Sequence, residues 1–172
     1  ALNANNKPFT MTNNDRFLFV TVDDIFRPII RRSDFRDQIT ALLDDPYFLA
    51  VTSATGNKGT NTIHCDDISN TNNRNFCNNW WQMLLLTKLP ASASIIIDGA
   101  ATTNCNFVLI FGGQKTGAQV RLTNANQSDP ANYLEGANLA AFDTPTAHSS
   151  SFNGFSAFDA SNPSADLLRC LP

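Results

Sequence analysis

The sequence predicts an α+β domain in which an N-terminal kinked helix, or a pair of helices, packs on an antiparallel β-meander. Three observations favour this class. Only 16% of the 172 residues are charged and Glu135 is the only glutamate, so good surface-helix formers are scarce. Short apolar runs separated by turn residues fill the region 94–122. A helical apolar stripe precedes them over residues 22–44, and the length fits one domain over residues 1–172.

The first part of the chain predicts a lead-in followed by helix. Residues 1–15 are polar and rich in asparagine, so we expect a flexible lead-in. Apolar residues then recur at helical spacing, at Ile25, Ile29, Phe35, Ile39, Leu42 and Leu43. Pro28 removes a backbone donor and Ser33–Asp34 can cap a new helix, so we expect a kink or a break between them.

The next stretch is harder to assign. Residues 47–52 predict a strand because aromatic and branched side chains are frequent there. Residues 66–79 carry almost no apolar side chain and predict an irregular loop held by cysteine. Residues 80–86 are rich in leucine, so they predict a short buried helix capped by Asn78 or Asn79.

Three apolar runs predict the meander, with the second run in its middle: residues 95–97, 107–111 and 118–122. Asp98–Gly99 supplies a turn after the first run. Residues 124–166 are rich in turn residues, with a helical turn expected at 130–134 and a hairpin-like turn at Asn153–Gly154. We expect phenylalanines to fold this excursion back onto the sheet: Phe142, Phe152, Phe155 and Phe158. A last strand over 166–171 is expected beside the central one.

The cysteines predict an exported protein. The chain has four, none of them in a C-x-x-C pair, and an even number in a chain poor in lysine and glutamate is typical of an oxidising compartment. Three connectivities are possible, and we favour Cys65–Cys77 and Cys105–Cys170. No run of 18 apolar residues occurs, and the chain begins at Ala1 without a methionine. We therefore expect a processed or truncated product whose export segment or membrane anchor is missing.

Charge argues against a nucleic-acid partner, because the net charge is −3 and the pI is about 5.1, whereas a phosphate backbone requires a basic stripe. The densest basic stretch contains Arg27, Arg31, Arg32 and Arg36. We interpret it as the solvated face of a helix, the alternative being a patch that binds a partner. No metal or other cofactor is predicted, because the two histidines, His64 and His148, are far apart and no closely spaced ligand pairs occur.

No catalytic residues are predicted, and we expect a protein that is not an enzyme. His64 adjoins Cys65 and Asp66, but neighbouring residues seldom face one another, and His148 lacks a nucleophile elbow. Asp66–Asp67 lacks the frame of a calcium loop. Asp44–Asp45 is unusual because it lies at the C-terminal end of the predicted helix, where negative charge is unfavourable.

Tryptophans are the best candidates for contact with a partner. Trp80 and Trp81 each offer a large area with few rotatable bonds, and such side chains stack on sugars or anchor partners. Since Leu84, Leu85 and Leu86 follow closely, we expect at least one of the two rings to belong to the core. Arg74 is the third candidate for contact with a partner or a glycan.

Three segments of the C-terminal half resemble the globular region of bacterial type IV minor pilins and pseudopilins. They are residues 105–121 (CNFVLIFGGQKTGAQVR), 132–139 (NYLEGANL) and 166–172 (DLLRCLP). The leader and the long apolar N-terminal helix of that family are not in this sequence. The resemblance implies a non-enzymatic periplasmic, surface or pilus subunit for pilus assembly or adhesion. Its partners would be other pilin or pseudopilin subunits, and its C-terminal cysteine bridge would stabilise an exposed contact loop.

A second interpretation is a secreted or surface binding module, such as an adhesin, that recognises a glycan or a host receptor. It would use Trp80 or Trp81 together with the asparagine-rich loops.

Overall fold

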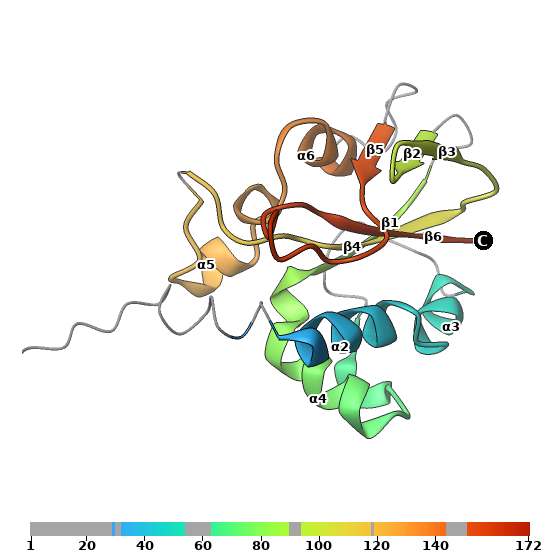
Figure 1. Cartoon of the computed structure of the whole chain (residues 1–172), viewed down its shortest axis with the longest axis vertical. Coiled ribbons are helices and arrows are strands. Elements are labelled where there is room, and N and C mark those ends of the chain that lie inside the picture. The colour runs from blue at the N-terminus through green and yellow to red at the C-terminus, as the bar shows by residue number, and fades with distance from the viewer. Residues whose placement is uncertain (1–28, 30–31, 54–62, 90–93, 118, 144–150) are drawn as a thin grey trace, which may run out of the picture.

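The structure is a computed structural model that describes residues 29, 32–53, 63–89, 94–117, 119–143 and 151–172. Figure 1 shows the central sheet across the middle, with a layer of helices on one side and a small second sheet with a helix on the other. The predicted α+β class is confirmed, although the arrangement differs from the predicted meander. The expected lead-in over 1–15 and the first half of the predicted helical region lie outside the described residues.

Short helices form the layer below the sheet in Figure 1: α2 (Ser33–Leu43), α3 (Tyr47–Ser53), η2 (Cys65–Asp67), α4 (Thr71–Trp80) and η3 (Trp81–Met83). α2 begins at the predicted break and buries Phe35, Ile39, Leu42 and Leu43, which confirms the C-terminal half of the predicted stripe. The strand predicted over 47–52 is wrong, because these residues form α3.

The irregular loop predicted over 66–79 is also wrong, because most of it forms α4. The N-cap is Asn70, whose side chain accepts hydrogen bonds from the amides of Asn72 (3.0 Å) and Asn73 (3.1 Å). The helix buries only Asn73 and Cys77, one turn apart. The half-buried Phe76 and Trp80 pack against the core, so a short apolar face, a polar cap and a disulfide together hold the helix.

The central sheet is antiparallel with the strand order β1 (Leu84–Lys88), β4 (Phe107–Phe111), β6 (Leu167–Leu171). All five residues of β4 are buried, because the strand is covered on both faces. The predictions of 107–111 as the central strand and of a last strand beside it are confirmed. The helix predicted over 80–86 is wrong beyond Met83, since Leu84 to Leu86 belong to β1.

A second small sheet has the order β3 (Ala100–Thr102), β2 (Ser94–Ile97), β5 (Ser151–Gly154). Asp98 (φ 54°) and Gly99 (φ 78°) form the tight turn between β2 and β3, as their sequence predicts. The predicted single meander is wrong, because β2 pairs with β3 and, in parallel, with β5, and residues 119–122 form no strand. Asn153–Gly154 ends a strand and is not a hairpin turn.

The excursion between β4 and β6 carries the short elements α5 (Asn124–Gln127), η4 (Pro130–Asn132) and α6 (Gly136–Asp143). The predicted helical turn at 130–134 is confirmed by η4. Phe142 and Phe152 are buried and Phe158 packs against the core, whereas the side chain of Phe155 is 46% exposed and this residue reaches the sheet through its backbone, which bridges to Leu167. Gly113 is required where it stands, because a Cβ there would lie 2.2 Å from the carbonyl oxygen of Ser164.

Each half of the molecule contains a buried asparagine bonded to a buried aspartate. Asn73 Nδ2 donates to Asp45 Oδ2 (2.6 Å) in the helix layer. Asn138 Nδ2 donates to Asp166 Oδ2 (2.7 Å), and the Gly113 amide donates to Asp166 Oδ1 (3.2 Å), beside the sheet. These bonds, together with the bond from the Tyr47 amide to Asp45 Oδ1 (3.0 Å), satisfy the two buried carboxylates.

Candidate binding site

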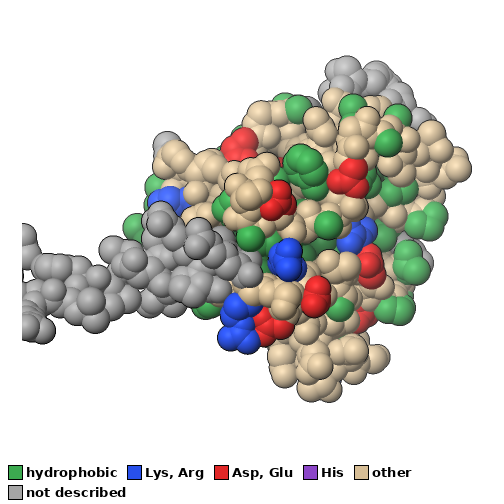
Figure 2. Space-filling model, viewed as in Figure 1, with side chains coloured by type: hydrophobic (Ala, Val, Ile, Leu, Met, Phe, Trp, Pro, Cys, Tyr) green, Lys and Arg blue, Asp and Glu red, His purple; other side chains and the backbone are tan. Residues whose placement is uncertain are grey.

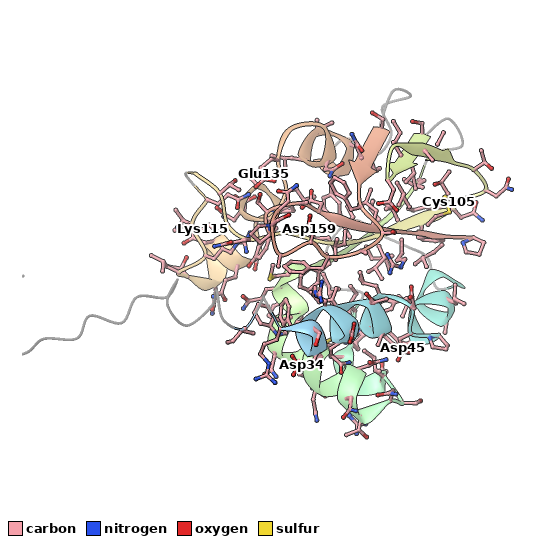
Figure 3. The ribbon with its side chains drawn as sticks, in the orientation of Figure 1. Asp34, Asp45, Cys105, Lys115, Glu135 and Asp159 are labelled. Carbon is pink, nitrogen blue, oxygen red and sulfur yellow. A yellow bond between two sulfur atoms is a disulfide. The ribbon has the colours of Figure 1, made fainter. Side chains whose placement is uncertain are left out.

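The two disulfides that the sequence predicts are both present. Cys65–Cys77 has a Cα–Cα separation of 5.5 Å, Cys105–Cys170 one of 5.2 Å, and no free cysteine remains. Two disulfides in a chain of this size indicate an oxidising, exported environment. Figure 3 shows Cys105 at one end of the sheet, with Lys115 and Glu135 at the opposite end.

The first disulfide borders a hollow of about 620 Å³ between η2 and the C-terminal end of α4. Seven described residues line it: Ile63, His64, Cys65, Asp66, Asp67, Asn78 and Trp81. Trp81 is 41% exposed, and the two aspartates, the histidine and Asn78 are exposed as well. The hollow is therefore open to solvent and combines one large aromatic ring with several polar groups.

Three links fix the walls of the hollow relative to one another. The disulfide joins Cys65 on η2 to Cys77 on α4. Asn78 Nδ2 donates to Asp66 Oδ1 (3.0 Å), which bridges the same two elements. The backbone amide of His64 donates to the hydroxyl of Tyr47 on α3 (2.6 Å), which anchors the start of η2.

The helical backbone decides which tryptophan reaches the hollow. Asn78 and Trp81 are three residues apart and lie on the same side of the helical segment. Trp80 turns instead toward α2, where its ring stacks on Phe76 (centroids 6.0 Å apart) and meets Phe35 edge-on (5.3 Å). The expectation that one ring belongs to the core is therefore met by Trp80, which packs against the core cluster.

Arg74, the third predicted contact, lies one turn before Asn78 and is not among the described residues that line the hollow. Its guanidinium is 3.5 Å from the hydroxyl of Thr71. The sequence did not single out Asn78 as a contact residue. The predicted Cys65–Cys77 bridge could have identified it, because this bridge brings Asn78 next to Asp66.

The described residues contain no free thiol and no cluster of metal ligands. Cys65 is bonded to Cys77, so the pair His64–Cys65 offers no free thiol for catalysis. Over the described ranges no group of three or more histidine, cysteine, aspartate or glutamate side chains is arranged to hold a metal ion. His148 lies outside the described residues.

Charged side chains elsewhere form local pairs. Of the predicted basic stretch, Arg32 and Arg36 are described and exposed, and Arg32 pairs with Asp34, which lowers the pKa of that carboxyl. Figure 2 shows acidic and basic side chains interspersed on one face of the molecule. In the interior, burial raises the pKa of Asp166 from 3.8 to about 6, against the hydrogen bonds from Asn138 and Gly113 that lower it.

Comparison with protein-family models, with curated proteins and with solved structures finds no match to this chain. Within the described ranges, no helix has the length and apolar character needed to cross a membrane.

Proposed function

We propose that the chain is an exported, non-enzymatic subunit of the type IV minor pilin or pseudopilin class, which works by docking against other subunits. The Cys105–Cys170 disulfide carries this proposal. It ties the last strand, β6, to the loop before the central strand, β4, at the end of this strand pair that lies away from the excursion, and so encloses both strands and the excursion in one covalent loop. A cysteine before an apolar strand, an excursion and a C-terminal cysteine strand is also the order on which the resemblance to that class rests.

Exposed apolar side chains on the excursion support a role in docking. Leu122 is 86% exposed, Phe155 46% and Val120 39%. Residues 119–122 owe their position to polar contacts, because the Val120 amide donates to Asn132 Oδ1 (2.8 Å) and the Arg121 guanidinium to the Asn132 carbonyl (2.6 Å). Val120 and Leu122 are thus held outward on a fixed segment, and a neighbouring subunit that covered them would remove apolar surface from water.

Site-specific crosslinking in the producing cells tests the proposal. A photo-crosslinking amino acid at Leu122 is expected to give adducts with envelope proteins whose precursors begin with a pilin-type leader. The matched control places the same group at Leu49, which is 51% exposed on α3 and outside the excursion. Adducts of position 122 with unrelated proteins, or equal adducts from both positions, would contradict the proposal.

The coding sequence upstream of Ala1 offers a second, inexpensive test. In this class a short basic leader and about 20 apolar residues precede the globular region, enough for a membrane-spanning helix. We expect them in the complete reading frame. A reading frame with a start codon close to Ala1 and no apolar segment would argue against the class.

A further inference from the structure

The hollow beside Cys65–Cys77 lies apart from the apolar side chains that we propose for docking, so its role can be considered separately. It lies in the helix layer, whereas Val120, Leu122 and Phe155 belong to the excursion between β4 and β6. Its volume of about 620 Å³ falls within the range of small-ligand sites. The η2 and α4 walls are fixed by a disulfide and a hydrogen bond, so a ligand would meet a preformed surface.

Trp81 is the first group that points to a ligand. Its neighbour Trp80 is the tryptophan that packs in this part of the core, where its ring contacts Phe76 and Phe35. Trp81 remains 41% exposed at the wall of a hollow, where its apolar ring contacts water. A rigid aromatic side chain with few rotatable bonds loses little entropy on binding and offers a flat apolar face.

The polar groups around the ring point to a ligand with hydroxyl groups. Asp66 and Asp67 supply acceptors, while the amide of Asn78 and the imidazole of His64 each supply both donors and acceptors. A hydroxyl group both donates and accepts, so it matches such a mixed set. A cationic ligand would use the acceptors alone and would leave the imidazole donor of His64 and the second amide hydrogen of Asn78 without a role.

Charge narrows the class of ligand. Two carboxylates line the hollow, and no lysine or arginine occurs among its described lining residues. Like charges brought together in a partly enclosed site repel, so acidic sugars are disfavoured. We propose that this hollow binds a neutral or amino-substituted hexose of a glycan. The sugar stacks on Trp81, and its hydroxyl groups bond to Asp66, Asp67 and Asn78.

A reporter for this site can be built from the chain itself. The protein has two tryptophans, so Trp80→Phe leaves Trp81 as the only indole and its emission then reports on the hollow. Phenylalanine at position 80 keeps an aromatic ring against Phe76 and Phe35, and circular dichroism checks that the fold is retained. The probes are the methyl glycosides of galactose, glucose, N-acetylglucosamine, glucosamine and N-acetylneuraminic acid, with oligolysine as the cationic peptide.

We expect at least one neutral or amino glycoside to shift the emission of Trp81 saturably, and N-acetylneuraminic acid to bind least. Saturation-transfer NMR on the ligand, which needs no tryptophan, is expected to show at least about a tenfold loss of affinity in Trp81→Ala. Asp67→Asn keeps the shape of the side chain and removes its charge. This variant is expected to bind the preferred glycoside more weakly. The ratio of its affinities for that glycoside and for N-acetylneuraminic acid is expected to fall by about threefold or more.

The matched control is Asp37→Asn, which removes an exposed carboxylate on α2 that does not line the hollow, and its affinities should equal those of the unaltered protein. Three results would overturn the proposal. The first is the absence of saturable binding by any glycoside up to about 10 mM. The second is glycoside binding that Trp81→Ala leaves unchanged. The third is binding of oligolysine without any glycoside, which would assign the hollow to a cationic peptide.

Discussion

The helix layer and the sheet are each closed by one disulfide and one buried asparagine–aspartate pair, but over very different lengths of chain. Cys65 and Cys77 are 12 residues apart, whereas Cys105 and Cys170 are 65 apart. The short bridge joins two neighbouring helical elements that form the walls of the hollow. The long bridge joins the loop before β4 to the last strand of the central sheet. The short bridge therefore shapes a local site, and the long one holds the fold together.

Removal of each bridge separates these two roles and gives the largest effects. In the loop-entropy relation, Cys105→Ser with Cys170→Ser lowers the free energy of unfolding by about 4 kcal/mol, and Cys65→Ser with Cys77→Ser lowers it by about 3 kcal/mol. Urea unfolding of the two double variants measures both values. We also expect glycoside binding to be lost only in the variant without Cys65 and Cys77. A larger loss of stability from the short bridge would contradict the comparison.

The same contrast explains which parts of the structure the sequence predicts. β4 and β6 follow from the sequence because a strand buried on both faces has a continuous apolar run, and residues 107–111 are such a run. α4 does not follow from it, because most of its residues are polar and it is held by contacts of Trp80 with Phe35 and of Asn73 with Asp45. Its stability comes from contacts distant in sequence, which periodicity does not report.

Pairing between distant strands is a second limit. The turn at Asp98–Gly99 can be predicted from the sequence, because Asp and Gly are residue types that accept the positive φ found there. β2 also pairs in parallel with β5, which lies more than 50 residues later along the chain. No local pattern specifies that partner. The candidate binding site could be predicted only in part. The expected Cys65–Cys77 bridge places Asp66 near Asn78, but which tryptophan faces the hollow depends on the helical phase of α4.

Acidification tests the buried carboxylate of the sheet half. Burial raises the pKa of Asp166 from 3.8 to about 6, so between these values the folded protein holds a proton that the unfolded chain has released. The contribution of Asp166 to stability is fully present below about pH 4 and is lost as the pH rises through 6, a change of about 3 kcal/mol. Urea unfolding from pH 3.5 to 7.5 measures it, as the difference between the unaltered protein and Asp166→Asn.

The variant is needed as the reference because other carboxyls act in the opposite direction. Hydrogen bonds lower the pKa of three exposed carboxyls, so their stabilisation is lost as the pH falls: Asp34, Asp98 and Asp159. These contributions cancel in the difference between two proteins that vary only at position 166. A difference that stays constant across the pH range would show that folding leaves the pKa of Asp166 near its ordinary value of 3.8.

The two asparagines give a direct comparison of the buried pairs. Asn73→Ala leaves Asp45 Oδ2 without its amide donor and lowers the free energy of unfolding by about 2 kcal/mol. Asn138→Ala should lower it more. Asn138 bonds to Asp166 and also, in both directions, to the backbone of Asn153 in β5 (2.8 Å each).

The pKa of Asp166 distinguishes loss of this bond from a general loosening. The hydrogen bond from Asn138 lowers that pKa, so Asn138→Ala is expected to raise it, whereas Asn73→Ala, in the helix layer, leaves it unchanged. Carbon-13 NMR of the Asp166 carboxyl through the titration measures both. Equal shifts in the two variants would mean that the two halves of the molecule are coupled.

Arg169 provides the smallest effect and tests the contact between the two halves. Its Nε donates to Asp44 Oδ1 (2.6 Å), and one terminal nitrogen donates to the Ser156 carbonyl (2.6 Å), so it links β6 to the C-terminal end of α2 and to the excursion. This ion pair accounts for the unfavourable position of Asp44, since the guanidinium offsets a negative charge at a helix C-terminus. The side chain of Asp44 is 55% exposed, so we expect Arg169→Met to lower the free energy of unfolding by only about 1 kcal/mol.

A double-mutant cycle with Asp44→Asn isolates the pair. Asp44→Asn removes the ion pair but also the unfavourable charge at the end of α2, so its effect on stability should stay within about 0.5 kcal/mol. The coupling energy between positions 44 and 169 should be favourable at low salt and should shrink in about 1 M salt, because ions screen an exposed pair. A favourable coupling energy that salt does not change would show that the hydrogen bond from Arg169 Nε to Asp44, and not the attraction between their charges, joins the sheet to the helix layer.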